Sequence, residues 1–376
     1  MSAPRIAVIG TGGHGAKNLA EAVRLDLEGR VHLVAVADPN PPAADSIPAH
    51  TRRHDDGLAL IAEEQVDVVV ISTPIHTHHA IAAAAVDAGA DVLLEKPTTA
   101  TMAEFDDLAS RATARDALVQ IGFQSLGCAA IDDVRRRVSA GEIGEVVRYA
   151  ATGAWVRDHA YWTRVRWAGR RTLDGRVVAD GVLTNPLAHA TATALALSAA
   201  TGRDDIAAIE LDLHRANLIE ADDTSVAVMT LPDGRRLTTA VTLAAERSNE
   251  AHVDVVGERG TLRLFYKTGI VRHLAADGRL IDERDFAFTP LLDDLLDARA
   301  HGSPLLAPIA ETGGFMRLVD AVMSAPDPHP IDASYLEQRD DDLGVRIVVR
   351  GVESAIHDAL RAQTTFTRLG APLAVS

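Results

Sequence analysis

The chain has 376 residues, of which 47% are hydrophobic and 24% charged, and its formal net charge is −16. This composition is typical of a globular protein with a sizeable core, and the length predicts two or three domains. No apolar run approaches the roughly 18 residues that a membrane-spanning helix needs, and the acidic balance argues against nucleic-acid binding.

Cys128 is the only cysteine in the chain. An intrachain disulfide is therefore impossible, and a metal site built from cysteines is not expected. The residues after Met1 pass directly into an apolar strand pattern, which leaves no room for a signal peptide. We therefore expect a protein of the reducing cytoplasm.

The first third of the chain predicts strands that alternate with helices of ten to fifteen residues, which is typical of parallel βαβ units. The predicted strands are 5–9, 31–37, 66–72, 91–94 and 118–123. The predicted helices run from the first glycine turn to residue 28 and over 58–64, 76–88 and 101–115. Thr101 and Glu104 have the spacing of a capping box. Prolines at 39, 41 and 42 predict a loop, and His54 is interpreted as a solvated loop residue.

The pattern changes after about Gln124, where strands follow one another with few helices between them. This arrangement predicts a mostly antiparallel sheet. The predicted strands are 146–152, 206–214, 224–231, 236–243, 252–256 and 261–266, and the predicted helices are 129–140, 186–199, 290–300, 309–324 and 352–361. We therefore predict an α/β Rossmann domain over 1–124 and an α+β domain with an open, mostly antiparallel sheet over 125–376.

A glycine-rich turn follows the first predicted strand. Gly10, Gly12 and Gly15 have the spacing that permits a tight turn, close approach of a pyrophosphate and close packing of the next helix. The start of that helix offers amide groups to the phosphates. Asp38 ends the second predicted strand, 23 positions after Gly15, close to the offset expected for the acid that binds ribose hydroxyls. We therefore predict dinucleotide binding.

Asp38 also bears on the choice of cofactor. A carboxylate at the ribose repels the 2′-phosphate of NADP, so the sequence favours NAD. Arg52 and Arg53 would weaken that preference if their loop folds back.

Glu95, Lys96 and Pro97 close the apolar run 91–94, which predicts a buried strand. The carboxyl ends of such strands are where open α/β sheets bind ligands. A lysine ammonium placed there hydrogen-bonds a substrate hydroxyl and stabilises a developing alkoxide. The alternative is a solvated lysine at a strand end. We favour the first interpretation, which places Lys96 at the reacting centre of a nicotinamide-dependent oxidoreductase.

Four segments of the first third resemble the glucose-fructose oxidoreductase / inositol dehydrogenase family, known as Gfo/Idh/MocA. They are Gly10-Thr11-Gly12-Gly13-His14-Gly15, Ser72-Thr73-Pro74-Ile75-His76-Thr77-His78, Ala88-Gly89 and Val92-Leu93-Leu94-Glu95-Lys96-Pro97. The resemblance implies a loop that lies against the cofactor and a lysine beside the nicotinamide, so that Lys96 is catalytic. The expected cofactor-binding residues are Gly10, Thr11, Gly12, Gly13, His14, Gly15, Asp38, Ser72, Thr73, Pro74, His76, His78, Glu95, Lys96 and Gln124.

In the second domain the resemblance implies a catalytic histidine, His189. The family usually has an Asp four positions before it, where this chain has Asn185, and an acid three positions after it, where this chain has Ala192. These departures put the usual Asp–His relay in doubt and suggest a distinct subfamily.

The residues around His189 support its role as a base. Asn185 and Pro186 have the types preferred at the N-cap and first position of a helix, which places His189 in the first turn. The positive helix end disfavours imidazolium, so a neutral ring is available to accept a proton. The alternative is a core histidine bonded to a carbonyl. Asn185 either contacts substrate, as a catalytic residue, or only caps its helix.

All three tryptophans of this chain, which is only 4% aromatic, lie between residues 155 and 167 among several arginines. One interpretation is an interface or hydrophobic patch held by arginines. The other is a wall that covers sugar C–H groups with aromatic faces and bonds hydroxyls with charged groups. The expected substrate-binding residues are Trp155, Arg157, Asp158, Tyr161, Trp162 and Arg164. The histidines at 76, 78 and 79 lack further ligands, so no metal site is predicted.

The sequence thus predicts an NAD-dependent dehydrogenase that acts on a secondary hydroxyl of a sugar, inositol or related polyol. One alternative is a glycoside-cleaving enzyme that keeps NAD bound and oxidises its sugar transiently. Another is a non-catalytic, NAD-sensing protein. By analogy with the family we expect a homodimer or homotetramer, with no nucleic-acid or membrane partner.

Overall fold

The computed structural model describes residues 3–374, which form two compact units. One unit contains the chain up to Phe123 together with Pro290–Ala310, and the other contains Gln124–Thr289 and the chain from Glu311 onward. The segment at 290–310 therefore differs from the expectation that 125–376 form one domain. Its leucines pack on the first unit's sheet, and this burial explains the difference. None of the described helices is both long and apolar enough to cross a membrane.

The first unit is built on a six-stranded sheet in the order β3-β2-β1-β4-β5-β6, with every pairing parallel. This order is that of a dinucleotide-binding Rossmann sheet, whose strand order reverses between β1 and β4. The strands are β1 (Arg5–Ile9), β2 (His32–Ala37), β3 (Arg52–His54), β4 (Val68–Ile71), β5 (Asp91–Leu94) and β6 (Val119–Ile121).

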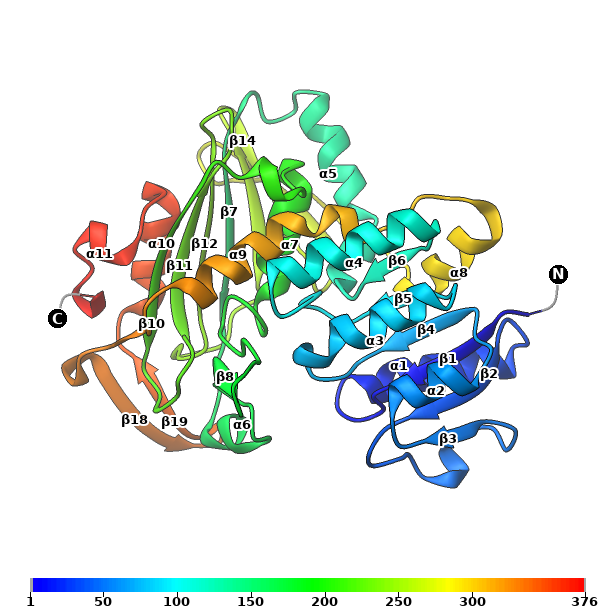
Figure 1. The fold of residues 1–376 in the computed structure, drawn as a ribbon. Helices are drawn as coiled ribbons and strands as arrows, with labels where there is room; N and C mark the ends of the chain where they lie inside the picture. The colour runs from blue at the N-terminus through cyan, green and yellow to red at the C-terminus, as the bar shows by residue number, and fades with distance from the viewer. Residues whose placement is uncertain (1–2, 375–376) are drawn as a thin grey trace. The chain divides into compact units, whose positions relative to one another are not determined.

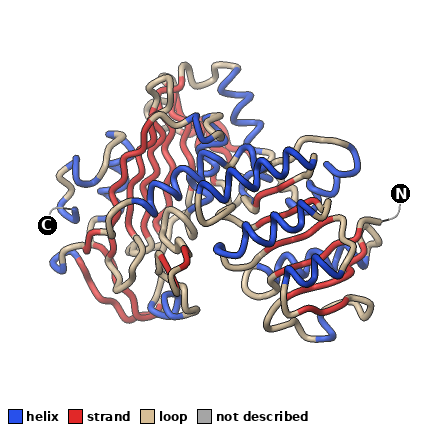
Figure 2. Tube along the Cα trace, viewed as in Figure 1, coloured by secondary structure: helices blue, strands red, loops and turns tan. Residues whose placement is uncertain are grey.

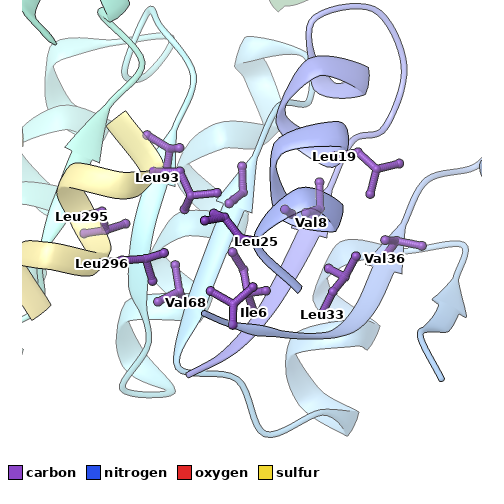
Figure 3. Packing of buried hydrophobic residues seen from close by; sticks show 14 of the residues in the cluster. Ile6, Val8, Leu19, Leu25, Leu33, Val36, Val68, Leu93, Leu295 and Leu296 are labelled. Carbon is purple, nitrogen blue, oxygen red and sulfur yellow. The ribbon is translucent and has the colours of Figure 1, made fainter. Parts of the chain in front are cut away.

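Helices cover both faces of this sheet (Figure 1). They are α1 (Gly15–Leu27), α2 (Gly57–Glu63), α3 (Ile75–Asp87), α4 (Met102–Arg115) and α8 (Leu291–His301). On one face, α1 and α8 bury leucines against alternate strand residues such as Ile6, Val8 and Val68, as Figure 3 shows. Alternation along each strand is what lets a parallel sheet build two cores.

The predicted elements of this unit agree with the structure to within a few residues, and the capping box of α4 is confirmed in both directions. The strand β3 was missed. Arg52, Arg53 and His54 pair with β2, so the interpretation of His54 as a solvated loop residue is wrong. Short edge strands that carry charged side chains lack the apolar alternation by which strands are recognised.

The second unit is built on a nine-stranded sheet in the order β16-β15-β14-β13-β7-β12-β11-β10-β17. Figure 2 shows its long strands in red. The pairings are antiparallel except β7 with β12 and β10 with β17, which confirms a mostly antiparallel sheet. The strands are β7 (Val146–Ala154), β10 (Ala208–Arg215), β11 (Thr224–Thr230), β12 (Arg236–Thr242), β13 (His252–Gly257), β14 (Gly260–Phe265), β15 (Ile270–Ala275), β16 (Leu280–Arg284) and β17 (His329–Pro330).

Two hairpins and six α-helices complete the described part of the unit. The hairpins are β8 (Thr172–Leu173) with β9 (Arg176–Val177) and β18 (Leu336–Asp341) with β19 (Gly344–Val349). The helices are α5 (Ala130–Ser139), α6 (His159–Thr163), α7 (Ala188–Ser198), α9 (Gly313–Ser324), α10 (Val352–Ala362) and α11 (Phe366–Leu369). The strands β15 to β19 were not predicted. Charged residues interrupt the apolar pattern of β15, β16, β18 and β19, and β17 has only two residues.

The two faces of the second sheet have different cover. Helix α7 packs on β7, β12 and β13, and the close approach requires Gly153, where a Cβ atom would lie 2.5 Å from Leu187. On the opposite face, α10 and α11 bury Val352, Ile356 and Phe366 against the sheet. Every residue of α7 except His189 is buried. A helix that is apolar all round belongs in a core, so a histidine at its accessible end stands apart from the pattern.

A fully buried carboxyl lies where the chain enters β11. Asp222 accepts a hydrogen bond of 2.8 Å from Ser225 Oγ, and a Cβ atom on Gly181 would lie 1.9 Å from Asp222 Oδ1. Burial raises the pKa of Asp222 to about 6, and burial also raises the pKa of the neighbouring Asp223. The charged form of Asp222 is therefore disfavoured in the folded protein.

We predict that Asp222→Asn becomes progressively more stable than the parent protein as the pH rises from 4 to 7. A folded-state pKa above the unfolded value gives stability that is present at low pH and lost as the pH rises through about 6. The relative gain is about 3 kcal/mol, which follows from two pKa units. Urea unfolding across this range measures it. Asp358→Asn, on the exposed face of α10, is the control, and parallel stability curves for parent and Asp222→Asn would contradict the prediction.

Candidate active site

The residues that follow the strands of the first unit lie in one row. The amides of Gly10, Ser72, Glu95 and Gly122 each donate to the last residues of a neighbouring strand, over 2.7–2.9 Å. The parallel register thus brings four loop starts to the carboxyl edge of the sheet. This edge is where doubly wound sheets bind their ligands.

The glycine loop has the shape that a dinucleotide pyrophosphate needs. Gly10 has a φ of +84°, and a Cβ atom there would lie 2.6 Å from the Ser72 carbonyl oxygen. A Cβ atom on Gly15 would lie 2.1 Å from the Gly10 oxygen, so only glycine permits α1 to start this close to the strand. A Cβ atom built on Gly12 would have no neighbouring atom within 4 Å, so the loop is open on the side that this glycine faces. No side chain caps the start of α1, where His14 is the N-cap residue. The N-terminus of a helix is a favourable place for a phosphate group.

Asp38 is fixed on the same loop. Its Oδ2 accepts hydrogen bonds from the amide of Thr11 at 2.7 Å and its hydroxyl at 3.1 Å, and its Oδ1 accepts from the amide of Asn40 at 2.8 Å. Arg52, which the sequence left as a possible influence on the choice between NAD and NADP, donates a hydrogen bond of 3.1 Å to Glu64. The carboxylate therefore has a set position at the end of β2.

Glu95 is the centre of a buried polar network at the strand ends. Its Oε1 lies 3.1 Å from His14 Nε2 and accepts from Asn18 Nδ2 at 3.3 Å, and Asn18 also donates to Ser72 Oγ at 2.8 Å. A Cβ atom on Gly122 would lie 2.9 Å from the Glu95 carboxyl group. Burial alone would raise the pKa of Glu95, but the bond to His14 and the charges of His14 and Lys96 hold it below the usual value. Sequence reasoning missed Asn18 and Gly122, because nothing in their local pattern indicates a distant carboxylate.

His78 ties two loops of the site together. Its Nδ1 lies 3.0 Å from the Pro97 oxygen and its Nε2 lies 2.8 Å from the Thr73 oxygen, and the ring is almost fully buried. Burial lowers the pKa of His78. The histidine thus holds the loop after β4 against the one after β5. The neighbouring His79 lies 2.7 Å from an oxygen of Asp107. Two other predicted cofactor residues begin helix α3: Pro74 is its exposed N-cap residue, and His76 is its second residue.

Lys96 directly follows the buried Glu95 and precedes a cis peptide bond to Pro97. Its amide donates to Glu95 Oε2 at 3.3 Å, and its side chain is partly exposed. Lys96 therefore lies next to the strand-end row, the residues Gly10, Ser72, Glu95 and Gly122 that follow the strands at the carboxyl edge of the sheet.

Gly13, a further residue of the glycine loop, has a φ of +55°.

In the second unit, His189 is the second residue of α7 and contacts the Ser125 hydroxyl. His189 Nδ1 lies 3.3 Å from Ser125 Oγ, and Thr193 Oγ1 donates to the same Ser125 Oγ at 3.0 Å. Ser125 belongs to the short 3-10 turn Gln124–Gly127, so the predicted cofactor residue Gln124 starts this turn in the second unit. Sequence reasoning missed Ser125 and Thr193, although it noted the missing acid partner.

The prediction that Asn185 caps α7 is wrong, because the helix begins at Ala188 with Leu187 as the N-cap residue. Asn185 instead lies in the preceding turn, where its Nδ2 donates to Asp180 Oδ1 at 2.5 Å. Asp180 is buried, and its Oδ2 accepts from the Gly169 amide at 2.8 Å and lies 3.4 Å from Arg164 Nη2. Asp180 is an acid of this region that sequence reasoning missed.

The tryptophan-rich segment forms a ladder of cations and rings. Arg157 lies 5.0 Å from the Trp155 ring and 4.8 Å from the Tyr161 ring, and Arg164 lies 3.8 Å from the Tyr161 ring and 5.1 Å from that of Trp167. Such stacks hold guanidinium groups in place with their edges available for hydrogen bonds. Through the contact of Arg164 with Asp180, the ladder joins the turn that carries Asn185.

Two predicted wall residues have structural contacts of their own. Asp158 is the N-cap residue of α6 and accepts from the Tyr161 amide at 2.9 Å. Trp162 is buried, with its ring edge-on to Tyr161 at 4.9 Å. With Arg164 it also lines a hollow of about 1090 Å³, formed with residues 216–220 and the β18–β19 hairpin.

Family models match both units of this chain. Residues 4–123 match the oxidoreductase family model with an NAD-binding Rossmann fold, and residues 131–263 match the Gfo/Idh/MocA C-terminal domain. The chain belongs to the Gfo/Idh/MocA family of oxidoreductases, and its first unit is that family's NAD-binding domain.

Among the relatives of this chain, inositol 2-dehydrogenase 1 of Saccharopolyspora erythraea is 36% identical over 146 residues, which cover 38% of this chain and 43% of that protein. The aligned part is thus less than half of that relative's length. The inositol 2-dehydrogenase of Rubrobacter xylanophilus is 24% identical over 323 residues, or 83% of each protein. A levoglucosan dehydrogenase in complex with NADH and L-sorbose shares the fold, with a TM-score of 0.70, 18% identity and coverage of 88% of this chain and 100% of that one.

We predict that Asp38→Asn shifts cofactor preference towards NADP. The substitution keeps an oxygen for Thr11 but removes the charge that attracts ribose hydroxyls and repels a 2′-phosphate. A hydrogen bond to a charged group is worth about 1.5–3 kcal/mol, so the ratio of the NADP and NAD dissociation constants should change about tenfold or more. Fluorescence titration of both cofactors measures this ratio. Asp116→Asn, at the exposed end of α4, is the control, and an unchanged ratio in Asp38→Asn would refute the assignment.

Proposed function

We propose that this protein is an NAD-dependent dehydrogenase that oxidises a secondary hydroxyl of a sugar, an inositol or a related polyol. The observation that carries the proposal is the strand-end row of the first unit. It places Lys96 next to the buried Glu95 network, on the same sheet edge as the open glycine loop. The inositol dehydrogenases among the relatives support the substrate class.

The residues of the first unit fit NAD. The loop around Gly12 and the uncapped start of α1 would hold the pyrophosphate, and Asp38 would hold the ribose of the adenosine half. When bound, the nicotinamide supplies a hydride acceptor. Lys96 would bind the substrate oxygen and stabilise the negative charge that grows on it as its proton leaves.

His189 would accept the hydroxyl proton. Its place in the first turn of α7 puts the ring near the positive helix end, which favours the neutral, proton-accepting form. A base that acts through Nε2 needs its own proton on Nδ1, donated to Ser125 Oγ. That oxygen has a second lone pair beside the bond from Thr193, so the tautomer is compatible with the contacts. We assign Ser125 as a positioning residue that replaces the expected acid.

The ladder would form the substrate wall. Trp155 and Tyr161 offer ring faces to C–H groups, and Arg157 and Arg164 offer hydrogen-bond donors to hydroxyls. Asp158 would contribute through its position at the start of α6, and Asn185 through its bond to Asp180. We further propose that the enzyme is a cytoplasmic dimer or tetramer, as its family resemblance and its single, buried Cys128 suggest.

Lys96→Met should lower turnover about 100-fold or more while NAD affinity stays nearly unchanged. The reason is that a donor to the developing oxyanion acts on the reacting oxygen rather than on the cofactor. NADH absorbance with a panel of inositols and sugars measures turnover, and calorimetry measures NAD binding. Net NADH release also separates this function from transient oxidation by a glycoside-cleaving enzyme. Full turnover in Lys96→Met would reject the role of Lys96.

His189→Asn should lower turnover about 100-fold or more, as expected for loss of a general base. Ser125→Ala should cost about fivefold and change the pH profile of kcat, because one neutral hydrogen bond is worth about 1 kcal/mol. Ser198→Ala is the control, since Ser198 Oγ donates to the Leu195 oxygen within α7, at 3.0 Å. Steady-state kinetics across pH measures all three. The assignment fails if His189→Asn keeps parent-like turnover.

A further inference from the structure

Two histidines and an aspartate converge on the first unit away from the strand-end row. His50 Nε2 lies 3.3 Å and His32 Nδ1 lies 3.6 Å from the same oxygen, Asp26 Oδ1. One potential ligand atom from each residue lies within 4.8 Å of the others. Among the described residues, no other group of three His, Cys, Asp or Glu side chains meets this distance. The three residues belong to different segments of the chain, and their spacing matches no metal-binding motif considered above.

The backbone holds the three residues in place. Asp26 Oδ1 accepts a hydrogen bond of 2.8 Å from the Leu33 amide, which orients the carboxylate. His32 opens β2, and its amide donates to the Pro4 oxygen at 2.8 Å. His50 precedes Thr51, whose hydroxyl donates to the Leu33 oxygen at 2.9 Å. The cluster thus joins α1, β2 and the segment before β3 through fixed contacts.

We propose that Asp26, His32 and His50 bind a divalent transition-metal ion, with Zn²⁺ as the best match. Bonds of about 2.0–2.1 Å from nitrogen and oxygen to a tetrahedral ion place the ligand atoms about 3.3–3.4 Å apart. The observed separations of 3.3 and 3.6 Å from Asp26 Oδ1 are close to this value. Two imidazoles and one carboxylate are ligands that zinc accepts.

Hydrogen bonding alone accounts for the cluster less well. Both rings share one acceptor oxygen that the Leu33 amide already uses, and both separations exceed the usual 2.7–3.2 Å for such bonds. The rings are also stacked, with centroids 4.5 Å apart. Two protonated rings in this arrangement would repel each other, whereas a metal ion uses the lone pairs of two neutral rings.

The site is placed for stability rather than for the reaction. His32 begins β2, whereas the cofactor residue Asp38 follows its end, so the ion would lie near the amino edge of the parallel sheet. Both histidines are almost half exposed, which leaves the remaining coordination positions to water. Bound metal would clamp α1 to β2 and to the segment before β3, and would leave turnover unchanged.

Calorimetric titration of Zn²⁺ into the full-length, chelator-treated protein without a histidine tag tests this site. We expect one ion per chain and an increase in Tm when Zn²⁺ is present. His32→Gln and His50→Gln should each weaken binding more than about tenfold. Replacing Asp26 is avoided, because its carboxylate also fixes the Leu33 amide. Binding of Co²⁺ should add the visible absorption of a four-coordinate ion, and this signal should vanish in the same variants.

His54→Gln provides the control. His54 belongs to the neighbouring strand β3, lies 3.3 Å from Glu64, and is outside the cluster. It should bind Zn²⁺ as the parent protein does. The proposal is overturned if the parent protein binds no zinc, or if His32→Gln and His50→Gln bind it with parent-like affinity. Circular dichroism of each variant separates loss of binding from loss of fold.

Discussion

The parallel register of the first sheet is the constraint on which the rest of the nucleotide site depends. Because neighbouring strands end at the same level, the residues that follow them meet at one edge, and hydrogen bonds from Gly10, Ser72, Glu95 and Gly122 fix that level. Glu95 then becomes a buried charge that must be compensated. His14 and Asn18 supply that compensation from the start of α1, so the network that stabilises the carboxylate also positions the glycine loop.

In the second unit, the buried helix α7 exposes one polar side chain, that of His189. Alanines let α7 approach its sheet closely, and Gly153 removes the side chain that would prevent it. His189 is left at the accessible end of that helix. The Ser125 hydroxyl contacts the His189 ring, and the Thr193 hydroxyl donates to Ser125 in turn.

Local pattern predicted much of this. Apolar runs separated by helical segments predicted the Rossmann strands, and the glycine spacing and the Lys96 motif indicated the cofactor site. The predictions that failed concern features that depend on contacts between residues distant in sequence. The amphipathic pattern of α8 does not say which sheet it covers, and Asn185 has the residue type of an N-cap but bonds the buried Asp180 instead. Partners such as Asn18 carry no signal until the fold brings them to a charge.

The most direct test of the account is to follow the hydrogen that leaves the substrate. The protein is incubated with NAD and inositols or sugars that carry deuterium on their hydroxyl-bearing carbons, and the reduced cofactor is analysed by mass spectrometry and NMR. The account predicts deuterium at C4 of the nicotinamide with at least one of these polyols. Cofactor that binds but gains no deuterium from any of them would contradict it.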